Sequence, residues 1–207
     1  MKLFLKSISR RVHENHHEQE CKSTGGAWQS LTVWRKSLVL KCNGFTVIDS
    51  NGNLIFRVDN YPGRPEEVVL MDGSGKPLLT ICRRNKFRVL VDNWLVYEGE
   101  MNDSSSKKPI CCARKHLTIL QPSANVLAHV YYRPSDKRYA YVIEGSYVNR
   151  SCWVLDESRR VVAEIKKKES VNGDVSFGAE VFLLIVRPGF SHNFAMVIVL
   201  LLDQMFS

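Results

Sequence analysis

Apolar and polar residues alternate along most of the chain from Leu31 onward, and small clusters of turn-forming residues interrupt the alternation. The stretch "SLVLKCNGFTVIDSNGNLIFRVDNY" shows this well, with β-branched and aromatic runs separated by Asn-Gly and by Asp, Ser and Asn. An alternation of period two places successive side chains on opposite faces of a strand. The pattern therefore predicts short antiparallel strands that are joined by hairpins.

One hairpin unit occurs three times along the chain. Two apolar residues precede an aspartate, three or four turn residues follow, and a second alternating strand comes next. The aspartate can accept hydrogen bonds from the backbone N–H groups ahead of it and so close the turn. We therefore expect Asp49, Asp72 and Asp156 to be structural rather than catalytic. The units are "VIDSNGNLIFRV" (47–58), "LMDGSGKPLLTI" (70–81) and "VLDESRRVVAEI" (154–165).

Strands of similar length fill most of the remaining sequence, and helical periodicity is nearly absent. The two clearest loops, 60–67 and 101–109, are too short to separate two domains. Strands at this density predict a single barrel or sandwich. The additional strands are expected near 87–97, 117–120, 126–133, 139–146, 151–155 and 181–186.

The end of the chain, "HNFAMVIVLLLDQMFS", breaks this pattern with eight uninterrupted apolar residues, 195–202. A helix from Ser191 to Met205 would be about 22 Å long. A membrane-spanning helix needs about 20 apolar residues, which corresponds to a length of about 30 Å. A membrane span is therefore not predicted. A strand is possible on propensity, and a helix that is apolar on all faces is the other possibility. Such a helix must be buried all around, and the inside of a closed barrel would bury it.

The chain carries 29 Lys and Arg against 21 Asp and Glu, a formal net charge of +8 over 207 residues. This balance favours anionic partners such as nucleic acid or acidic lipid head groups. A positive surface that serves only solubility is the alternative. The hydrophobic fraction of 44% is sufficient for a folded core.

Cysteine spacing excludes two classes of small protein. The six cysteines are scattered without a Cys-x-x-Cys pair, which argues against a disulfide scaffold and a zinc ribbon. Most lie in strand-like runs such as "LVLKCNGF" and "LLTICRR", where they are expected to fill the core. A reducing, intracellular compartment is therefore expected.

Residues 1–27 are predicted to form a flexible polar extension. The apolar part of this segment, Leu3–Leu5, is too short for a signal peptide. The extension contains His13, His16, His17 and Cys21, but nothing in the sequence fixes the geometry of a metal site there. No metal and no cofactor are therefore predicted.

Several stretches together resemble a known family. "LTVWRKSLVLKCNGFTVIDSNGNLIFRVDNY", "EVVLMDGSGKPLLTICRR", "YVIEGSYVNRSCWVLDESRRVVAEIKKK" and "FAMVIVLLLDQM" resemble, in collinear order, the LURP-one-related proteins of plants. That family is similar in fold to the tubby C-terminal domain and the phospholipid scramblases. The resemblance implies one domain over 28–207, a closed barrel of about twelve antiparallel strands around a central hydrophobic helix near 191–205.

The same resemblance implies a non-enzymatic protein. The founding member of the family is linked to basal plant defence, and tubby-like proteins bind phosphoinositides at the plasma membrane and can enter the nucleus. Scramblases are lipid-modified membrane proteins that are linked to calcium. No set of functional residues carries over motif by motif, because the chain has no EF-hand loop and Cys111-Cys112 is only a pair. A cytoplasmic protein with plasma-membrane association or nuclear entry is the expectation.

Two basic clusters, "RRNKFRVLV" and "RRVVAEIKKK", are the candidate lipid-binding sites. Convergent Lys and Arg side chains can neutralise phosphate groups, and each is worth about 1 kcal/mol near an anionic leaflet. In the first cluster, strand geometry would place Arg84, Lys86 and Arg88 on one face. Cations that merely keep strands soluble are the alternative. The predicted phosphoinositide-binding residues are Arg83, Arg84, Lys86, Arg88, Lys166 and Lys168.

Other activities have weaker support in the sequence. Phe87 and Trp94 lie near basic residues, but no RNA-binding or zinc motif accompanies them, so nucleic acid ranks below lipid. No Walker loop, G-x-S-x-G or H-E-x-x-H motif occurs, and His116, His129 and His192 are isolated and expected to pack or cap. The competing hypothesis is a soluble protein-interaction or nuclear regulatory scaffold with no lipid role.

Overall fold

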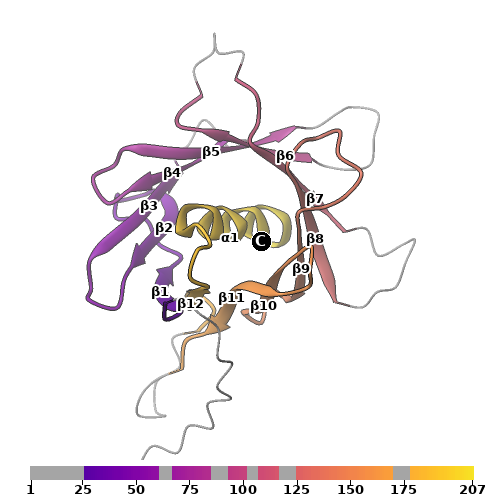
Figure 1. The fold of residues 1–207 in the computed structure, drawn as a ribbon. Coiled ribbons are helices and arrows are strands. Elements are labelled where there is room, and N and C mark those ends of the chain that lie inside the picture. The colour runs from indigo at the N-terminus through magenta and orange to yellow at the C-terminus, as the bar shows by residue number, and fades with distance from the viewer. Residues whose placement is uncertain (1–25, 61–66, 85–92, 102–106, 117–124, 170–177) are drawn as a thin grey trace, which may run out of the picture.

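Twelve antiparallel strands form one closed barrel around a helix, α1 (Figure 1). The computed structural model describes residues 26–60, 67–84, 93–101, 107–116, 125–169 and 178–207. The strands are β1 (Gln29–Trp34), β2 (Asn43–Ile48), β3 (Leu54–Asn60), β4 (Glu67–Asp72), β5 (Pro77–Arg84), β6 (Asn93–Glu98), β7 (Cys111–Lys115), β8 (Val126–Tyr131), β9 (Tyr141–Ser146), β10 (Ser151–Asp156), β11 (Val161–Lys167) and β12 (Val181–Val186).

Each strand pairs with its neighbours in the sequence, and the first strand pairs with the last. The pairing of β1 with β12 runs from Gln29 opposite Val186 to Trp34 opposite Val181. Closure leaves the sheet without a free edge, so that the wall satisfies its own backbone hydrogen bonds. The predicted closed antiparallel barrel is confirmed, and the sandwich alternative is excluded.

The apolar run at the end of the chain is a helix, as the resemblance implied, and not a strand. α1 comprises His192–Phe206, and the Ser191 hydroxyl caps it by accepting a hydrogen bond from the N–H of Phe194. Every residue from 195 to 202 is at most 1% exposed. Inward-facing side chains of the wall, such as Val33, Ile165 and Leu184, are equally buried and form one core with the helix. The helix therefore occupies the interior of the barrel.

The direction of α1 distinguishes the two ends of the barrel. We call the end at which the helix begins the N-terminal mouth; there Phe190 and Phe194 pack on Tyr141, with ring centroids 5.5 and 5.6 Å apart. We call the other end the C-terminal mouth; there the Lys115 ammonium donates to the carbonyl of Met205 over 2.8 Å. Because neighbouring strands are antiparallel, the strand pairings assign each turn to one mouth.

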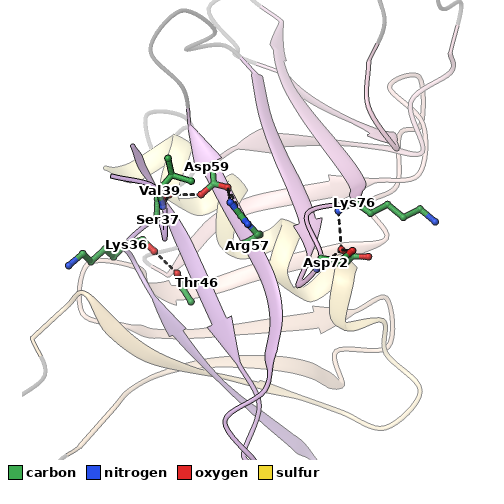
Figure 2. Close-up of polar contacts among 9 residues, drawn as sticks. Lys36, Ser37, Val39, Thr46, Arg57, Asp59, Asp72 and Lys76 are labelled. Atoms are coloured by element: carbon green, nitrogen blue, oxygen red, sulfur yellow. Dashed lines mark hydrogen bonds and ion pairs between the residues drawn. The ribbon is translucent and has the colours of Figure 1, made fainter. Parts of the chain in front are cut away.

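The three aspartate hairpins all lie at the N-terminal mouth and share one geometry. The Oδ1 atoms of Asp49, Asp72 and Asp156 each accept from the N–H groups two and four residues ahead, over 2.8–3.0 Å. Figure 2 shows the contact between Asp72 and Lys76. In each hairpin the strand register shifts between the two residues that precede the aspartate. The predicted structural role of these aspartates is confirmed.

The residue three positions after each aspartate adopts a left-handed backbone. Gly52 and Gly75 do so with φ of 84° and 91°, and Arg159 does so with φ of 63°. Glycine reaches this region without steric cost, whereas arginine does not. The Arg159 guanidinium makes two contacts with the Glu144 carboxylate, at 2.7 and 3.0 Å, which hold the third turn in place.

The turn aspartates predict a loss of stability at low pH. Hydrogen bonds lower the pKa of both carboxyls. The largest contribution comes from the Asn53 side chain for Asp49 and from the Ser74 hydroxyl for Asp72. A carboxyl whose pKa is lower in the folded state stabilises the fold at pH values above its unfolded-state pKa, near 3.8. This stabilisation is lost as the pH falls through the folded-state pKa. The D49N/D72N variant should be less stable at pH 7 and should lose less further stability below about pH 4.

Urea denaturation at a series of pH values measures this effect. Glu157→Gln is the control, because it removes one negative charge from the β10–β11 turn without removing one of the turn hydrogen bonds. A D49N/D72N variant with the acid profile of the wild-type protein would show that these carboxylates do not stabilise the hairpins.

Burial of α1 predicts a severe effect of a charge at its centre. Val199 is 0% exposed, so Val199→Asp places a carboxylate where no partner exists, at a cost of several kcal/mol. We expect no soluble, cooperatively melting V199D protein. Val148→Asp is the control, because Val148 is 71% exposed and should tolerate the same change. A folded V199D protein would contradict the burial of the helix, and circular dichroism with thermal melting distinguishes the two results.

Candidate functional site at the C-terminal mouth

The strand ends and turns at the C-terminal mouth are rich in cations. The described carboxylates there are fewer, namely Asp59, Glu67, Glu169, Glu180 and Asp203. At the N-terminal mouth basic residues also occur, but carboxylates nearly balance them: Asp49, Asp72, Glu98, Glu100, Asp136, Asp156 and Glu157. Among the described residues, the C-terminal mouth therefore carries the larger net positive charge. The described cations of the C-terminal mouth are Arg35, Lys36, Lys41, Arg83, Arg84, Lys115, Arg150, Lys166, Lys167 and Lys168.

The structure brings the two predicted basic clusters to the same mouth but not to one patch. Arg83 and Arg84 end β5, whereas Lys166 lies near the end of β11 and Lys168 follows that strand. In the closed order of strands, β5 and β11 are diametrically opposite. The clusters therefore face each other across the mouth. Lys86 and Arg88 lie outside the described residues, and their alternation with Arg84 on one strand face stays a prediction.

Several of the predicted cations already contact the barrel. The Arg83 guanidinium lies over the ring of the buried Trp94, 5.6 Å from its centroid. The Lys166 ammonium is 3.1 Å from a carboxylate oxygen of Glu164, and the Lys168 ammonium donates to the Thr32 hydroxyl over 3.1 Å. The charge of Lys166 is therefore partly neutralised within the wall, which makes it the weakest of the predicted lipid contacts.

A buried carboxylate joins α1 to the wall at this mouth. The Oδ1 atom of Asp203 accepts from the Arg35 guanidinium at 3.0 Å, from the Tyr147 hydroxyl at 3.2 Å and from the Ser207 hydroxyl at 2.7 Å. Partial burial opposes the charge on Arg35, but Asp203 raises its pKa above the ordinary value. Burial, and then the negative charge of Asp203, raise the pKa of Tyr147. The Asp203 carboxylate therefore joins the Arg35 guanidinium of the wall and a neutral Tyr147 phenol to the end of the helix.

A polar pocket of about 510 Å³ opens beside this network. The Asn60 side-chain oxygen is buried and has no hydrogen-bond partner, so the pocket holds one acceptor that is not satisfied. Glu180 and Asp203 line the pocket together with Arg35, which makes its interior nearly balanced in charge. An anionic group is therefore better accommodated by the cations around the mouth than inside the pocket. The other lining residues are Lys36, Cys42, Asn43, Gly44, Phe45, Gln204 and Ser207.

The segment "SLVL", which the sequence pattern assigned to a strand, is part of a loop. Residues 35–42 connect β1 to β2 at the C-terminal mouth, and Leu38 and Leu40 are 52% and 91% exposed. In this loop the Ser37 hydroxyl donates to Asp59 of β3 and accepts from the N–H of Val39. Cys42, predicted to fill the core, is only partly buried at the end of this loop. Sequence alternation alone could not reveal these exposed leucines.

Three strand cysteines behave as packing residues, whereas Cys82 of β5, also predicted to fill the core, is only partly buried. Cys111, Cys112 and Cys152 are buried, and burial raises the pKa of Cys111 and of Cys152 to about 12. A thiol with such a raised pKa is a poor nucleophile. The prediction that most cysteines fill the core is confirmed for these three.

The prediction that His116 and His129 are isolated is wrong. Their rings contact each other, with centroids 5.5 Å apart, because the pairing of β7 with β8 brings them together on the outer wall. Tyr139 lies 5.0 Å from His129 in the same cluster. Burial, and then the nearby His116, lower the pKa of His129, so it packs as a neutral ring. The expected packing role therefore fits His129.

A helix that could cross a membrane and a cluster of metal ligands are both absent from the described residues. No helix there is both long and apolar enough to cross a membrane. In the same residues, no group of three or more His, Cys, Asp or Glu side chains is placed to hold a metal ion. The N-terminal cluster of histidines and Cys21 lies outside this part of the chain.

The contact between Arg35 and Asp203 predicts a coupling between wall and helix. Arg35→Ala leaves the buried carboxylate without its cation and should destabilise the fold by about 2 kcal/mol, less than for a fully buried pair because Arg35 is partly exposed. The R35A/D203N variant should lose less stability than the sum of the losses in the two single variants, because no unpaired charge remains in it. Additive losses in urea denaturation would show that the pair does not link helix and wall.

Comparisons with known proteins agree with this architecture. The model of the family described as LURP-one-related matches residues 29–203. Protein LURP-one-related 17 of Arabidopsis thaliana is 47% identical over 99% of both chains. Protein LURP-one-related 8 of the same plant is 49% identical over 85% of this chain and 86% of its own. An X-ray structure of an Arabidopsis thaliana protein, 26% identical, matches with a TM-score of 0.60 over 86% of this chain and 90% of that one.

Proposed function

The chain belongs to the LURP-one-related family, and from the charge distribution of its barrel we propose that it is a non-enzymatic module that binds the surface of anionic membranes through its C-terminal mouth. The observation that carries this proposal is the collection of cations at that mouth. Each Lys or Arg near an anionic leaflet contributes about 1 kcal/mol, so several give reversible attachment.

The positions of the cations favour a flat anionic surface over a single bound head group. Arg83 and Arg84 on one wall, and Lys167 and Lys168 on the other, are roughly 20 Å apart for a barrel of this strand number. A distance of that size exceeds one lipid head group, but a bilayer can contact both walls at once. Acidic phospholipids in general, with phosphoinositides as the most highly charged among them, are therefore the proposed ligands.

A soluble protein-interaction scaffold is the second candidate. A groove of about 460 Å³ at the N-terminal mouth supports it, because aromatic side chains, including Tyr132, Tyr141, Phe190 and Phe194, line the groove. Aromatic clusters of this kind are typical of protein contacts. The link to plant defence and the nuclear entry that the family resemblance implies stay predictions for either candidate.

Vesicle flotation tests the membrane proposal. We expect the protein to float with phosphatidylcholine vesicles that contain phosphatidylserine or a phosphoinositide, and not with phosphatidylcholine alone. The R83E/R84E and K167E/K168E variants should each bind at least about tenfold more weakly, because each loses two favourable contacts of about 1 kcal/mol.

The matched control is K137E/R138E. It reverses two adjacent exposed cations at the N-terminal mouth and so changes the net charge by the same amount. An equal loss of binding in this control would show that net charge alone attracts the membrane. Absence of wild-type binding at low salt would contradict the proposal, and preference for a phosphoinositide over phosphatidylserine at equal vesicle charge would assign a specific head-group site.

A further inference from the structure

The loop between β1 and β2, residues 35–42, exposes two leucines to water. Leu40 is 91% exposed and Leu38 is 52% exposed, and Trp34 at the end of β1 is 42% exposed. Single exposed apolar residues are common on proteins, but here three lie within one short segment. Arg35, Lys36 and Lys41 flank them in the same segment. The loop therefore combines apolar side chains with cations at the mouth where cations already gather.

Polar contacts hold this loop in position (Figure 2). The Ser37 hydroxyl donates to the Asp59 carboxylate, whose side chain is 1% exposed, and accepts from the N–H of Val39 over 2.9 Å. The Thr46 hydroxyl donates to the Lys36 carbonyl over 2.7 Å. The Arg57 guanidinium binds the other oxygen of Asp59 over 2.9 Å. A buried carboxylate with these partners fixes the loop to β3 and β2.

The backbone around the loop is specialised for the same conformation. A Cβ atom at Gly44 would collide with the carbonyl oxygen of Val58 and would lie 3.2 Å from the Cβ of Ser37, so only glycine allows this close approach. Lys41 adopts a left-handed backbone, with φ of 65°, where the chain turns toward β2. Such a conformation is uncommon for a residue with a side chain. The leucines are therefore displayed by an organised loop.

We infer that this loop inserts Leu38 and Leu40 into the apolar boundary of an anionic bilayer. Trp34 suits the interface between head groups and acyl chains, where tryptophan is enriched in membrane proteins. The Lys36 ammonium lies 5.0 Å from the centroid of the Trp34 ring, and Lys41 follows Leu40 in the sequence. Cations therefore adjoin the apolar side chains. This insertion rests on the proposed membrane function, and charge complementarity selects an acidic bilayer as the partner.

The insertion adds a component that salt does not screen. Cations at the mouth attract the membrane electrostatically, and their contribution falls as ionic strength rises. Transfer of leucine side chains out of water depends on the apolar area that is buried and not on screening. Wild-type protein that has reached an anionic vesicle should therefore retain measurable binding at salt concentrations that remove purely electrostatic attachment.

Replacing both leucines by serine tests the insertion. L38S/L40S should bind phosphatidylserine-containing vesicles at least about tenfold more weakly than wild type, which corresponds to about 1.4 kcal/mol, and should lose the binding that persists at high salt. Its melting temperature should not fall, because both side chains are exposed. The matched control, W28S/I110S, removes two exposed apolar side chains, 46% and 41% exposed, from the N-terminal mouth and should bind as wild type does.

A second measurement locates the loop relative to the acyl chains. Tryptophan fluorescence of the L40W variant should be quenched by vesicles with brominated acyl chains, and more strongly than that of wild type. Tryptophan at residue 110, in an I110W variant, should add no such quenching. This measurement detects insertion even when the change in affinity is small.

The outcomes separate the insertion from the proposed function. Wild-type protein that binds anionic vesicles, together with unchanged L38S/L40S binding and no added L40W quenching, would overturn the insertion and leave surface attachment intact. Wild-type protein that binds no vesicle would overturn both. If L38S/L40S instead abolishes self-association in size-exclusion chromatography without affecting vesicle binding, the loop is a protein contact and the insertion is wrong.

Discussion

The burial of a helix whose central residues, 195–202, are all apolar is the constraint on which the rest of the structure depends. α1 satisfies its own backbone hydrogen bonds, but its side chains need an apolar surface on every side, and the closed wall of strands supplies it. The helix therefore fills the interior of the barrel. Polar contacts to α1 occur at its ends, through Ser191 at one mouth and through Asp203 and the Met205 carbonyl at the other. Because the helix fills the interior, a ligand would bind at the mouths or on the outer wall of the barrel.

The two mouths differ because the same strands begin and end with different residues. Aspartate turns close hairpins at the N-terminal mouth and bring carboxylates close to the cations there. Among the described residues, the C-terminal mouth has fewer carboxylates than the N-terminal mouth, and its β1–β2 loop adds exposed leucines. Because its two ends differ in charge, the barrel would turn one mouth toward an anionic surface, as the membrane proposal requires. This asymmetry, rather than an internal cavity, is the feature that supports membrane attachment.

Local features of this fold could be predicted from the sequence, whereas distant ones could not. The aspartate turns depend on hydrogen bonds within five residues, so Asp49 and its equivalents are recognisable in the pattern, and the length of the terminal run excludes a membrane span. Alternation does not record which strand lies beside which, so the placement of Arg84 opposite Lys168 and the contact of His116 with His129 required the structure. The exposed leucines were misassigned because alternation does not record contacts with distant residues, such as the hydrogen bond from Ser37 of their loop to Asp59 of β3.

Hydrogen–deuterium exchange with and without anionic vesicles tests attachment through the C-terminal mouth most directly. It reports each segment of the barrel in one experiment and needs no substitution. Attachment through this mouth predicts slower exchange in residues 35–42 and at the ends of β5 and β11 when phosphatidylserine-containing vesicles are added, with no change at the three aspartate turns. Slower exchange at the aspartate turns alone, or unchanged exchange throughout the barrel, would contradict it.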